Sequence, residues 1–129
     1  MLAVDTNVIV RYLTDDDPVQ SRVARRLIDD DQIRLLPTVL LETEWVLRSL
    51  YGFRREQIHA GLTAFTALRN VSVEHAGKIA EALANFALGL DFADALHLAC
   101  ANDCAAFATF DRKLVASARK AKAGKVKAL

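Results

Sequence analysis

Four acidic residues occupy positions from which their carboxylates can act together: Asp5, Glu42, Asp94 and Asp111. Asp5 directly follows the apolar run Leu2-Ala3-Val4, and Asp111 directly follows the run 106–110. Sites in open α/β sheets form at the carboxyl ends of strands, so we expect both acids at such an edge. Each position also suits the N-cap of the following helix, where a carboxylate accepts hydrogen bonds from backbone amides. Both roles stay open at this point.

Asp91 and Asp94 lie three residues apart at the predicted start of another helix. Asp91 suits the N-cap of that helix. Asp94 is flanked by alanines and Leu96, and a carboxylate in such apolar surroundings needs a partner or a cation. His97 follows one turn later on the same side, where it is a metal ligand, an RNA contact or an ordinary helix-surface residue.

Glu42 lies in a predicted helix, residues 38–50, whose apolar positions form one stripe. We expect Glu42 and Trp45 to lie near that stripe and Glu44 to point outward. A glutamate beside a buried face is unusual without a charge partner. Glu42 therefore either forms a buried ion pair with an arginine or binds a cation.

Four carboxylates brought within a few ångströms repel one another unless a cation neutralises them. Ligands that are all oxygen atoms select Mg²⁺ or Mn²⁺. Such a site suits phosphodiester hydrolysis, because the metal lowers the pKa of bound water and neutralises charge on the phosphate. The chain has no cysteine–histidine set with zinc spacing and none of the GxxxxGK[ST], GxGxxG or GxSxG motifs.

In order along the chain, these residues resemble the four motifs of the PIN-domain ribonucleases: Val4-Asp5-Thr6-Asn7, Leu41-Glu42, Asp91 to His97, and Ala108 to Asp111. The resemblance covers about residues 2–115 and is closest to the VapC-type toxins of toxin–antitoxin pairs. It implies a Mg²⁺-dependent endoribonuclease that is usually dimeric and is inhibited by a small antitoxin. It also implies that Asp5, Glu42, Asp94 and Asp111 are the catalytic metal ligands.

Further residues are expected near the metal or in contact with RNA. Those beside the four acids are Thr6, Asn7, Asp91, His97 and Thr109. The candidate phosphate contacts are Arg11, Arg48, Arg112 and Lys113, for which solvated or ion-paired surface positions are the alternative.

Two other functions stay open. A phosphatase that uses Asp5 as nucleophile would want a second acid two residues later, where this chain has Asn7. A non-catalytic binding module would use the same acids only as helix caps and in ion pairs.

The resemblance also predicts protein partners. A short antitoxin segment would lie in an apolar groove between the first helices. The candidate contacts are Val23, Leu27, Leu40, Trp45 and Val46. We expect a homodimer too, because the alanine-rich helix 76–88 allows close packing.

The elements that position these residues are short apolar runs alternating with longer helical patterns, which is typical of a mostly parallel sheet. The expected strands are 2–4 (buried), 33–36, 71–73 and 106–109, with an edge strand from Val126. The expected helices are 6–13, 18–30, 38–50, 54–68, 74–88, 92–104 and 112–120, with Asp17-Pro18 and Thr38 as start signals. We therefore predict one PIN-like α/β domain, residues 1–129, with three layers and a short central sheet flanked by helices.

Composition excludes several classes of protein. The chain has 129 residues, 53% of them hydrophobic, which is too apolar for a disordered protein. No run approaches the roughly 18 apolar residues of a membrane span, and we expect no signal peptide. Cys100 and Cys104 are expected to be reduced core residues of a cytoplasmic protein.

Charge is distributed unevenly although the net charge is only +1. Residues 1–110 contain 10 basic and 15 acidic residues, whereas residues 111–129 contain 7 basic residues and 1 acidic residue. A nucleic-acid binder held only by a large basic face would have a higher pI. Contact with RNA must therefore depend on local charges or on a bound cation. The basic tail from about residue 119 matches none of the motifs and is assigned no role.

Overall fold

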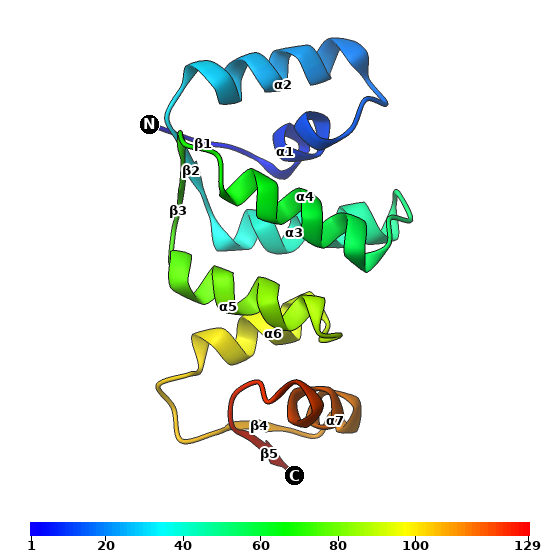
Figure 1. Ribbon diagram of the computed structural model, residues 1–129, viewed down its shortest axis with the longest axis vertical. Helices are drawn as coiled ribbons and strands as arrows, with labels where there is room; N and C mark the ends of the chain where they lie inside the picture. Colours follow the sequence, from blue (N-terminus) through cyan, green and yellow to red (C-terminus); the bar gives the residue numbers. More distant parts are fainter. The chain divides into compact units, whose positions relative to one another are not determined.

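The computed structural model describes residues 1–129, which form two compact units, Met1–His75 and Ala76–Leu129 (Figure 1). Each unit alternates helices with short strands, and every strand pair is parallel. The predicted α/β class, with short parallel strands and flanking helices, is confirmed. None of the helices is long and apolar enough to cross a membrane.

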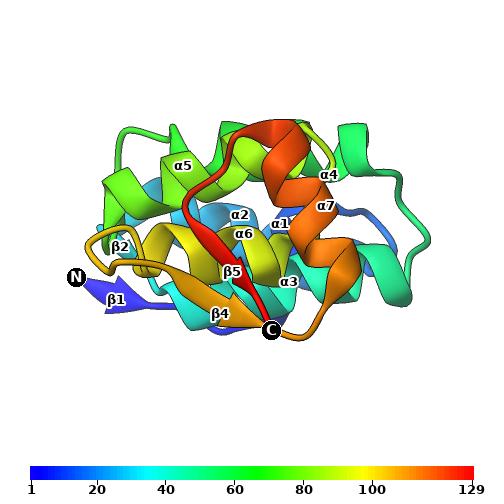
Figure 2. The same ribbon diagram turned by 90° about the horizontal axis from the view of Figure 1, so that it is seen from below.

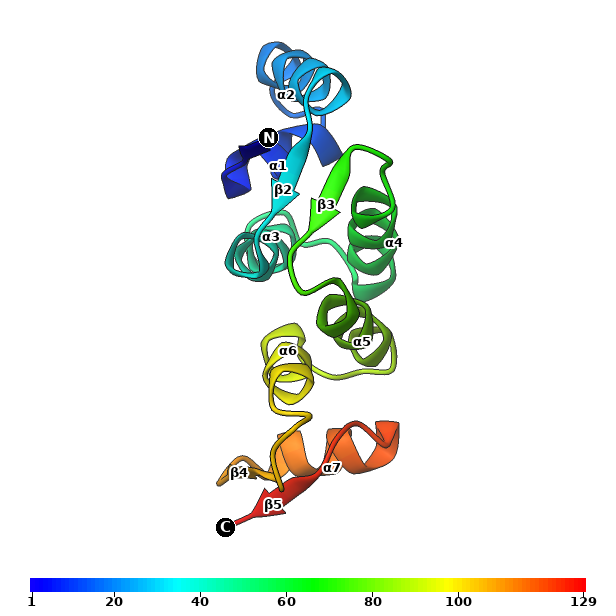
Figure 3. The ribbon, with the colours of Figure 1, turned by 90° about the vertical axis from the view of Figure 1, so that its left-hand side faces the viewer.

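The first unit contains a three-stranded parallel sheet of order β1-β2-β3. Its elements are β1 (Leu2–Ala3), α1 (Thr6–Leu13), α2 (Pro18–Asp30), β2 (Ile33–Leu35), α3 (Pro37–Ser49), α4 (Arg55–Thr66) and β3 (Val71–Val73). Strands β2 and β3 lie side by side in Figure 3. In the central strand β2, Ile33 and Leu35 are buried and Arg34 between them is exposed, as expected for side chains that alternate across a sheet. The core beneath the helices includes Ile9, Ile28, Leu40, Leu47 and Phe65.

The second unit contains α5 (Ala76–Ala87), α6 (Phe92–Cys100), β4 (Phe107–Thr109), α7 (Arg112–Ala121) and β5 (Val126–Ala128). Helices α5 and α6 pack together, and the rings of Phe86 and Phe92 meet edge to face with centroids 5.5 Å apart. Helix α7 connects β4 to β5 and packs against both strands (Figure 2). Its apolar side, Leu114, Val115 and Ala118, is buried.

Several predicted element boundaries are confirmed. Helix α1 covers the predicted residues, and α2 begins at Pro18 with Asp17 as N-cap. The carboxylate of Asp17 accepts a hydrogen bond from the Gln20 backbone amide at 3.1 Å. Gly89 follows α5 with φ of 114°, a conformation that favours glycine and ends the helix. The predicted last strand is present as β5.

The strands form two sheets, whereas the sequence suggested one central sheet. Strand β4 pairs with β5, in the register Phe107↔Val126, rather than with a strand of the first unit. The cause is local: α7 is a short crossover that returns the chain directly beside β4, so the backbone groups of β4 find partners within the same unit.

Three details of the predicted elements are wrong. The first strand, Leu2–Ala3, is not buried: it is an edge strand, and Leu2 is 44% exposed, although Val4 after it is buried. Thr38 is not an N-cap, because the helix already begins at Pro37, whose fixed φ suits the first helical position. Helix α6 ends at Cys100 rather than Cys104, and both cysteines are free and exposed, not in the core.

Candidate acidic site

The start of α1 brings Asp5, Thr6 and Glu42 together. Asp5 is exposed and is the N-cap of α1; its Oδ1 atom accepts a hydrogen bond from the Thr6 backbone amide at 2.7 Å. Thr6 is buried, and its hydroxyl donates a hydrogen bond to Glu42 Oε1 on α3. Thr6 therefore connects Glu42 to the strand end that carries Asp5, and Oδ2 of Asp5 remains without a protein donor.

The predicted positions of Glu42 and Glu44 on α3 are reversed in the structure. Glu42 is exposed, whereas Glu44 is only 2% exposed and pairs with Arg48, whose Nε atom lies 2.9 Å from Glu44 Oε2. The buried side of α3 contains Leu40, Glu44 and Leu47, spaced four and three residues apart as a helical face requires. The buried ion pair proposed for Glu42 thus belongs to Glu44, and Trp45 is half exposed.

Asp94 is the acid whose environment is most unusual. Its side chain is half-buried on the first turn of α6 and accepts no hydrogen bond from the protein. Burial raises the pKa of the Asp94 carboxyl, the negative charges of Asp91 and Asp111 raise it further, and His97 opposes them. The second unit therefore places Asp94 within electrostatic reach of two further carboxylates.

Asp91 and Asp111 both occupy N-cap positions but use their side chains differently. Asp91 precedes α6 and makes no side-chain cap hydrogen bond, so its carboxylate is exposed to solvent. Asp111 caps α7: its Oδ1 atom accepts hydrogen bonds from the amides of Lys113 at 2.9 Å and Leu114 at 3.1 Å. Its Oδ2 atom has no protein donor. The hydroxyl oxygen of Thr109 accepts a hydrogen bond from the Asp111 amide at 2.9 Å, which fixes the turn after β4.

The other residues expected near a metal have varied surroundings. His97 is exposed, and its ring stacks on Phe107 with centroids 6.0 Å apart and an interplanar angle of 11°. This stacking gives His97 a structural role on the surface of α6. Asn7 is exposed on α1 and lines a hollow beside α2.

The acids form two groups: Asp5 with Glu42 in the first unit, and Asp94 with Asp91 and Asp111 in the second. No three His, Cys, Asp or Glu side chains are arranged to hold a metal ion. Asp5, Asp94 and Asp111 nevertheless each retain a carboxylate oxygen without a protein donor. Carboxylate oxygens are the ligands that hard divalent cations prefer, so the donor chemistry fits such a cation.

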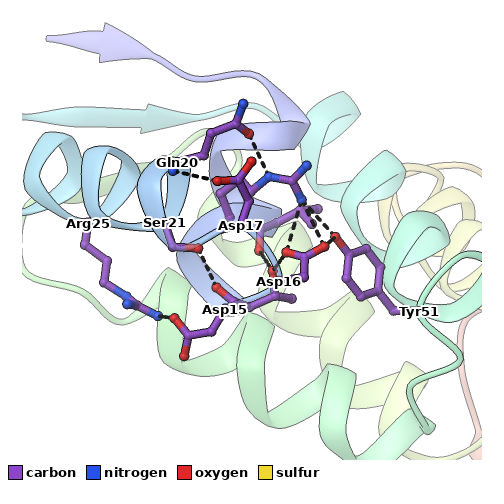
Figure 4. A network of polar contacts seen from close by, with 10 residues as sticks. Asp15, Asp16, Asp17, Gln20, Ser21, Arg25 and Tyr51 are labelled. Carbon is purple, nitrogen blue, oxygen red and sulfur yellow. Dashed lines mark hydrogen bonds and ion pairs between the residues drawn. The ribbon is translucent and has the colours of Figure 1, made fainter.

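The predicted phosphate contacts divide into two pairs. Arg11 is bound within the first unit by Asp16 at 3.2 Å, Gln20 at 2.8 Å and the Tyr51 hydroxyl at 2.9 Å. Figure 4 shows Asp16, Gln20 and Tyr51 gathered in this network. Arg48 pairs with Glu44, so the ion-paired alternative describes both of these arginines.

Arg112 and Lys113 instead are exposed on α7. Sequence reasoning missed that Arg119 and Lys120 lie on the same exposed side of this helix, seven residues further on. That spacing is two helical turns, so the sequence carried the signal for this shared face.

The structure is thus a helix-rich α/β protein with carboxylates at the ends of short parallel strands. Residues 2–120 match the family model described as PIN domain, and the chain belongs to the PIN domain family. PIN domains are in general metal-dependent nucleases, and they use divalent metal ions to act on nucleic acids. No individual curated protein matches the chain significantly.

Proposed function

We propose that this chain is a Mg²⁺-dependent endoribonuclease whose metal ligands are Asp5, Glu42, Asp94 and Asp111. Membership of the PIN domain family supports a metal-dependent nuclease. The observation that supports Asp94 and Asp111 is that Asp94 is a half-buried carboxylate without a donor and lies in the field of Asp91 and Asp111. Such a group is costly unless a cation compensates its charge. Asp5 and Glu42 are included because Thr6 brings them together at the start of α1.

The proposed ligands are all carboxylates, which favours Mg²⁺ or Mn²⁺ over softer metals. When bound, the cation lowers the pKa of a water molecule and neutralises charge on the phosphate. The chain's own residues position the ligands. Thr6 holds Glu42 through its hydroxyl, and Thr109 holds the backbone of Asp111.

The proposal is tested by incubating the purified chain with total RNA in Mg²⁺, in Mn²⁺ and in EDTA. We expect fragments with either metal and none in EDTA. Cleavage that persists in EDTA, or its absence under every condition, contradicts the proposal. A phosphorylated Asp5 trapped with phosphate esters would indicate the phosphatase alternative instead, and no thermal shift with metal would indicate a binding module.

Variants test the choice of ligands. Asp94→Asn and Asp5→Asn are each expected to lower RNA cleavage about 100-fold or more, because a charged metal ligand is lost. Asparagine can still cap α1 at position 5, so the fold is expected to survive. Asp103→Asn is the matched control, since Asp103 is an exposed acid in the turn after α6. Full activity of both ligand variants would contradict the assignment.

We further propose that the enzyme is the toxin of a toxin–antitoxin pair, held inactive in the cytoplasm by a small protein. Val23 on α2 is 65% exposed and lines, with Val8, Val19 and Leu27, a groove of about 270 Å³ between α1 and α2. An apolar segment of a partner fits such a groove. Leu40 is fully buried and therefore belongs to the core rather than to a docking surface.

An arginine or lysine from this partner would pair with the acids and compete with Mg²⁺. Raising Mg²⁺ is then expected to weaken the complex more than NaCl does at equal ionic strength. Equal effects of the two salts would argue for groove contact alone. Val23→Glu is expected to abolish binding of the partner while RNA cleavage remains, and unchanged binding would contradict the groove as its site.

A further inference from the structure

Helix α7 presents a face of four cations. Arg112, Lys113, Arg119 and Lys120 are all exposed, as is Ala116, the small residue among them. At 100° per residue these five positions fall within about 120° of the helix circumference. The opposite side of the helix, Leu114, Val115 and Ala118, is buried. We call the four exposed cations the α7 cationic face.

The α7 cationic face lacks acidic partners. Elsewhere in the chain Arg11, Arg25 and Arg48 each form an ion pair with an aspartate or glutamate. None of the four α7 cations does so, and Asp111 is the only acidic residue from 111 to 129. The carboxylate of Asp111 is engaged with backbone amides at the helix start. The cations are thus available to an external anion.

Helix stability does not explain all of these cations. Arg119 and Lys120 lie in the last turn, where positive charge is favourable to the helix dipole. Arg112 and Lys113 lie in the first turn, where positive charge is unfavourable. A sequence that places cations at the disfavoured end of a helix departs from local preference, as functional surfaces often do.

We propose that the α7 cationic face binds the phosphates of the RNA strand and leads it to Asp111 and Asp94. This inference rests on the proposed ribonuclease function. Asp111 directly precedes Arg112, so the face begins where the acids of the second unit lie. A polyanion that approaches these carboxylates needs nearby positive charge to offset repulsion, and phosphate contacts supply affinity without regard to base sequence.

The test compares two variants that each remove two positive charges. Arg119→Gln/Lys120→Gln changes the α7 cationic face, and Lys125→Gln/Lys127→Gln changes β5, where both lysines are also exposed. Binding of a labelled single-stranded oligoribonucleotide is measured by fluorescence anisotropy in EDTA over a range of NaCl concentrations. Circular dichroism first verifies that both variants are folded.

We expect the α7 variant to bind several-fold more weakly and to reduce the slope of log K against log salt by about 1.4, or about 0.7 for each lost phosphate contact. The β5 variant is expected to keep the slope of the original chain. Equal losses in the two variants, or no loss in the α7 variant, would overturn the proposal. Displacement of the RNA by polyglutamate at equal charge would also overturn it, because the face would then suit an acidic protein.

An RNA cleavage assay in Mg²⁺ distinguishes failure of the binding-surface proposal from failure of the ribonuclease proposal. If the original chain cleaves no RNA but binding still depends on the α7 cationic face, the ribonuclease proposal fails and the binding surface stands. If the original chain cleaves RNA and the α7 variant cleaves it with unchanged KM, the binding surface fails and the ribonuclease stands.

Discussion

The carboxylate of Asp94 has a raised pKa because burial and two neighbouring acids disfavour its charged form. A group whose pKa is higher in the folded state contributes stability below its unfolded value, and this contribution is lost as the pH rises through the folded pKa. The metal-free chain is therefore expected to lose stability as the pH rises through the titration of Asp94.

Asp94→Asn removes this loss. We expect the melting temperature of the variant in EDTA to exceed that of the original chain by about 1–3 °C near neutral pH. Near about pH 3, where the carboxyl of Asp94 is protonated, the difference is expected to vanish. Thermal denaturation at the two pH values measures both effects, and a lower melting temperature of the variant near neutral pH would contradict the account.

Asp16 shows the opposite shift. The hydroxyl of Tyr51 donates a hydrogen bond to Asp16 Oδ2 at 2.6 Å and is the main cause of a lowered pKa, with the Thr14 hydroxyl and Arg11 adding to it (Figure 4). This contribution to stability is present above the unfolded value of 3.8 and is lost as the pH falls through the folded pKa.

Tyr51→Phe is expected to remove most of the acid sensitivity that Asp16 causes. The melting temperatures of the original chain and the variant should differ most near neutral pH and converge as the pH falls below 3.8 and through the folded pKa of Asp16. Tyr12→Phe is the control. The ring of Tyr12 packs on that of Phe65, with centroids 5.4 Å apart, and the Tyr12 hydroxyl makes no hydrogen bond to Asp16. A difference between Tyr51→Phe and the original chain that does not change with pH would contradict the assignment.

At the scale of the element, α3 contains a buried charge. Glu44 is 2% exposed, and the guanidinium of Arg48 compensates it. Arg48→Met leaves the carboxylate without this partner, and we expect a loss of about 1–3 kcal/mol in the free energy of unfolding. Arg25→Met is the matched control, because its partner Asp15 is 76% exposed and such pairs contribute about 0–1 kcal/mol. Urea denaturation measures both, and equal losses would contradict the prediction.

Much of the element order could be predicted because the signals are local. The helix start at Asp17-Pro18 and the end at Gly89 depend on backbone geometry near one residue, and both are confirmed. The predicted burial of the two glutamates on α3 was wrong. Glu44 lies on the same buried face as Leu40 and Leu47, because Arg48, one turn away, neutralises its charge. The pattern of apolar residues alone does not detect a buried acid that is neutralised in this way.

For the candidate site, the positions of single acids could be predicted from the sequence, but the contacts between them could not. The strand ends at Asp5 and Asp111 follow from the alternation of strands and helices. The hydrogen bond from Thr6 to Glu42 joins residues 36 positions apart, and no local pattern reports such a contact. The pairing of β4 with β5 in a sheet of their own was also missed, because the alternation of strands and helices does not show which strands pair.

At the scale of the whole molecule, we propose that the chain forms a homodimer. The outward side of α5 carries the small residues Ala80 and Ala84, and Leu88 after its end is 62% exposed. Small side chains let two helices approach closely, and an exposed leucine gains from burial.

Sedimentation at micromolar concentration is expected to give a species of twice 14.2 kDa. Ala84→Glu is expected to shift it to the monomer, since a charge would be buried at the contact. A single 14.2 kDa species for the original chain would contradict the dimer.

The exposed positions of Cys100 and Cys104 have a practical consequence for that experiment. Accessible thiols on two molecules can be joined by air oxidation into a covalent pair, which would imitate a noncovalent dimer on sedimentation. Both thiols lie in the second unit, so Cys100→Ser/Cys104→Ser removes the artefact without touching the first. A maleimide dye reacts with the same two thiols and therefore labels only the second unit. The dye can then report, by a change in fluorescence, the binding of metal or RNA near α6.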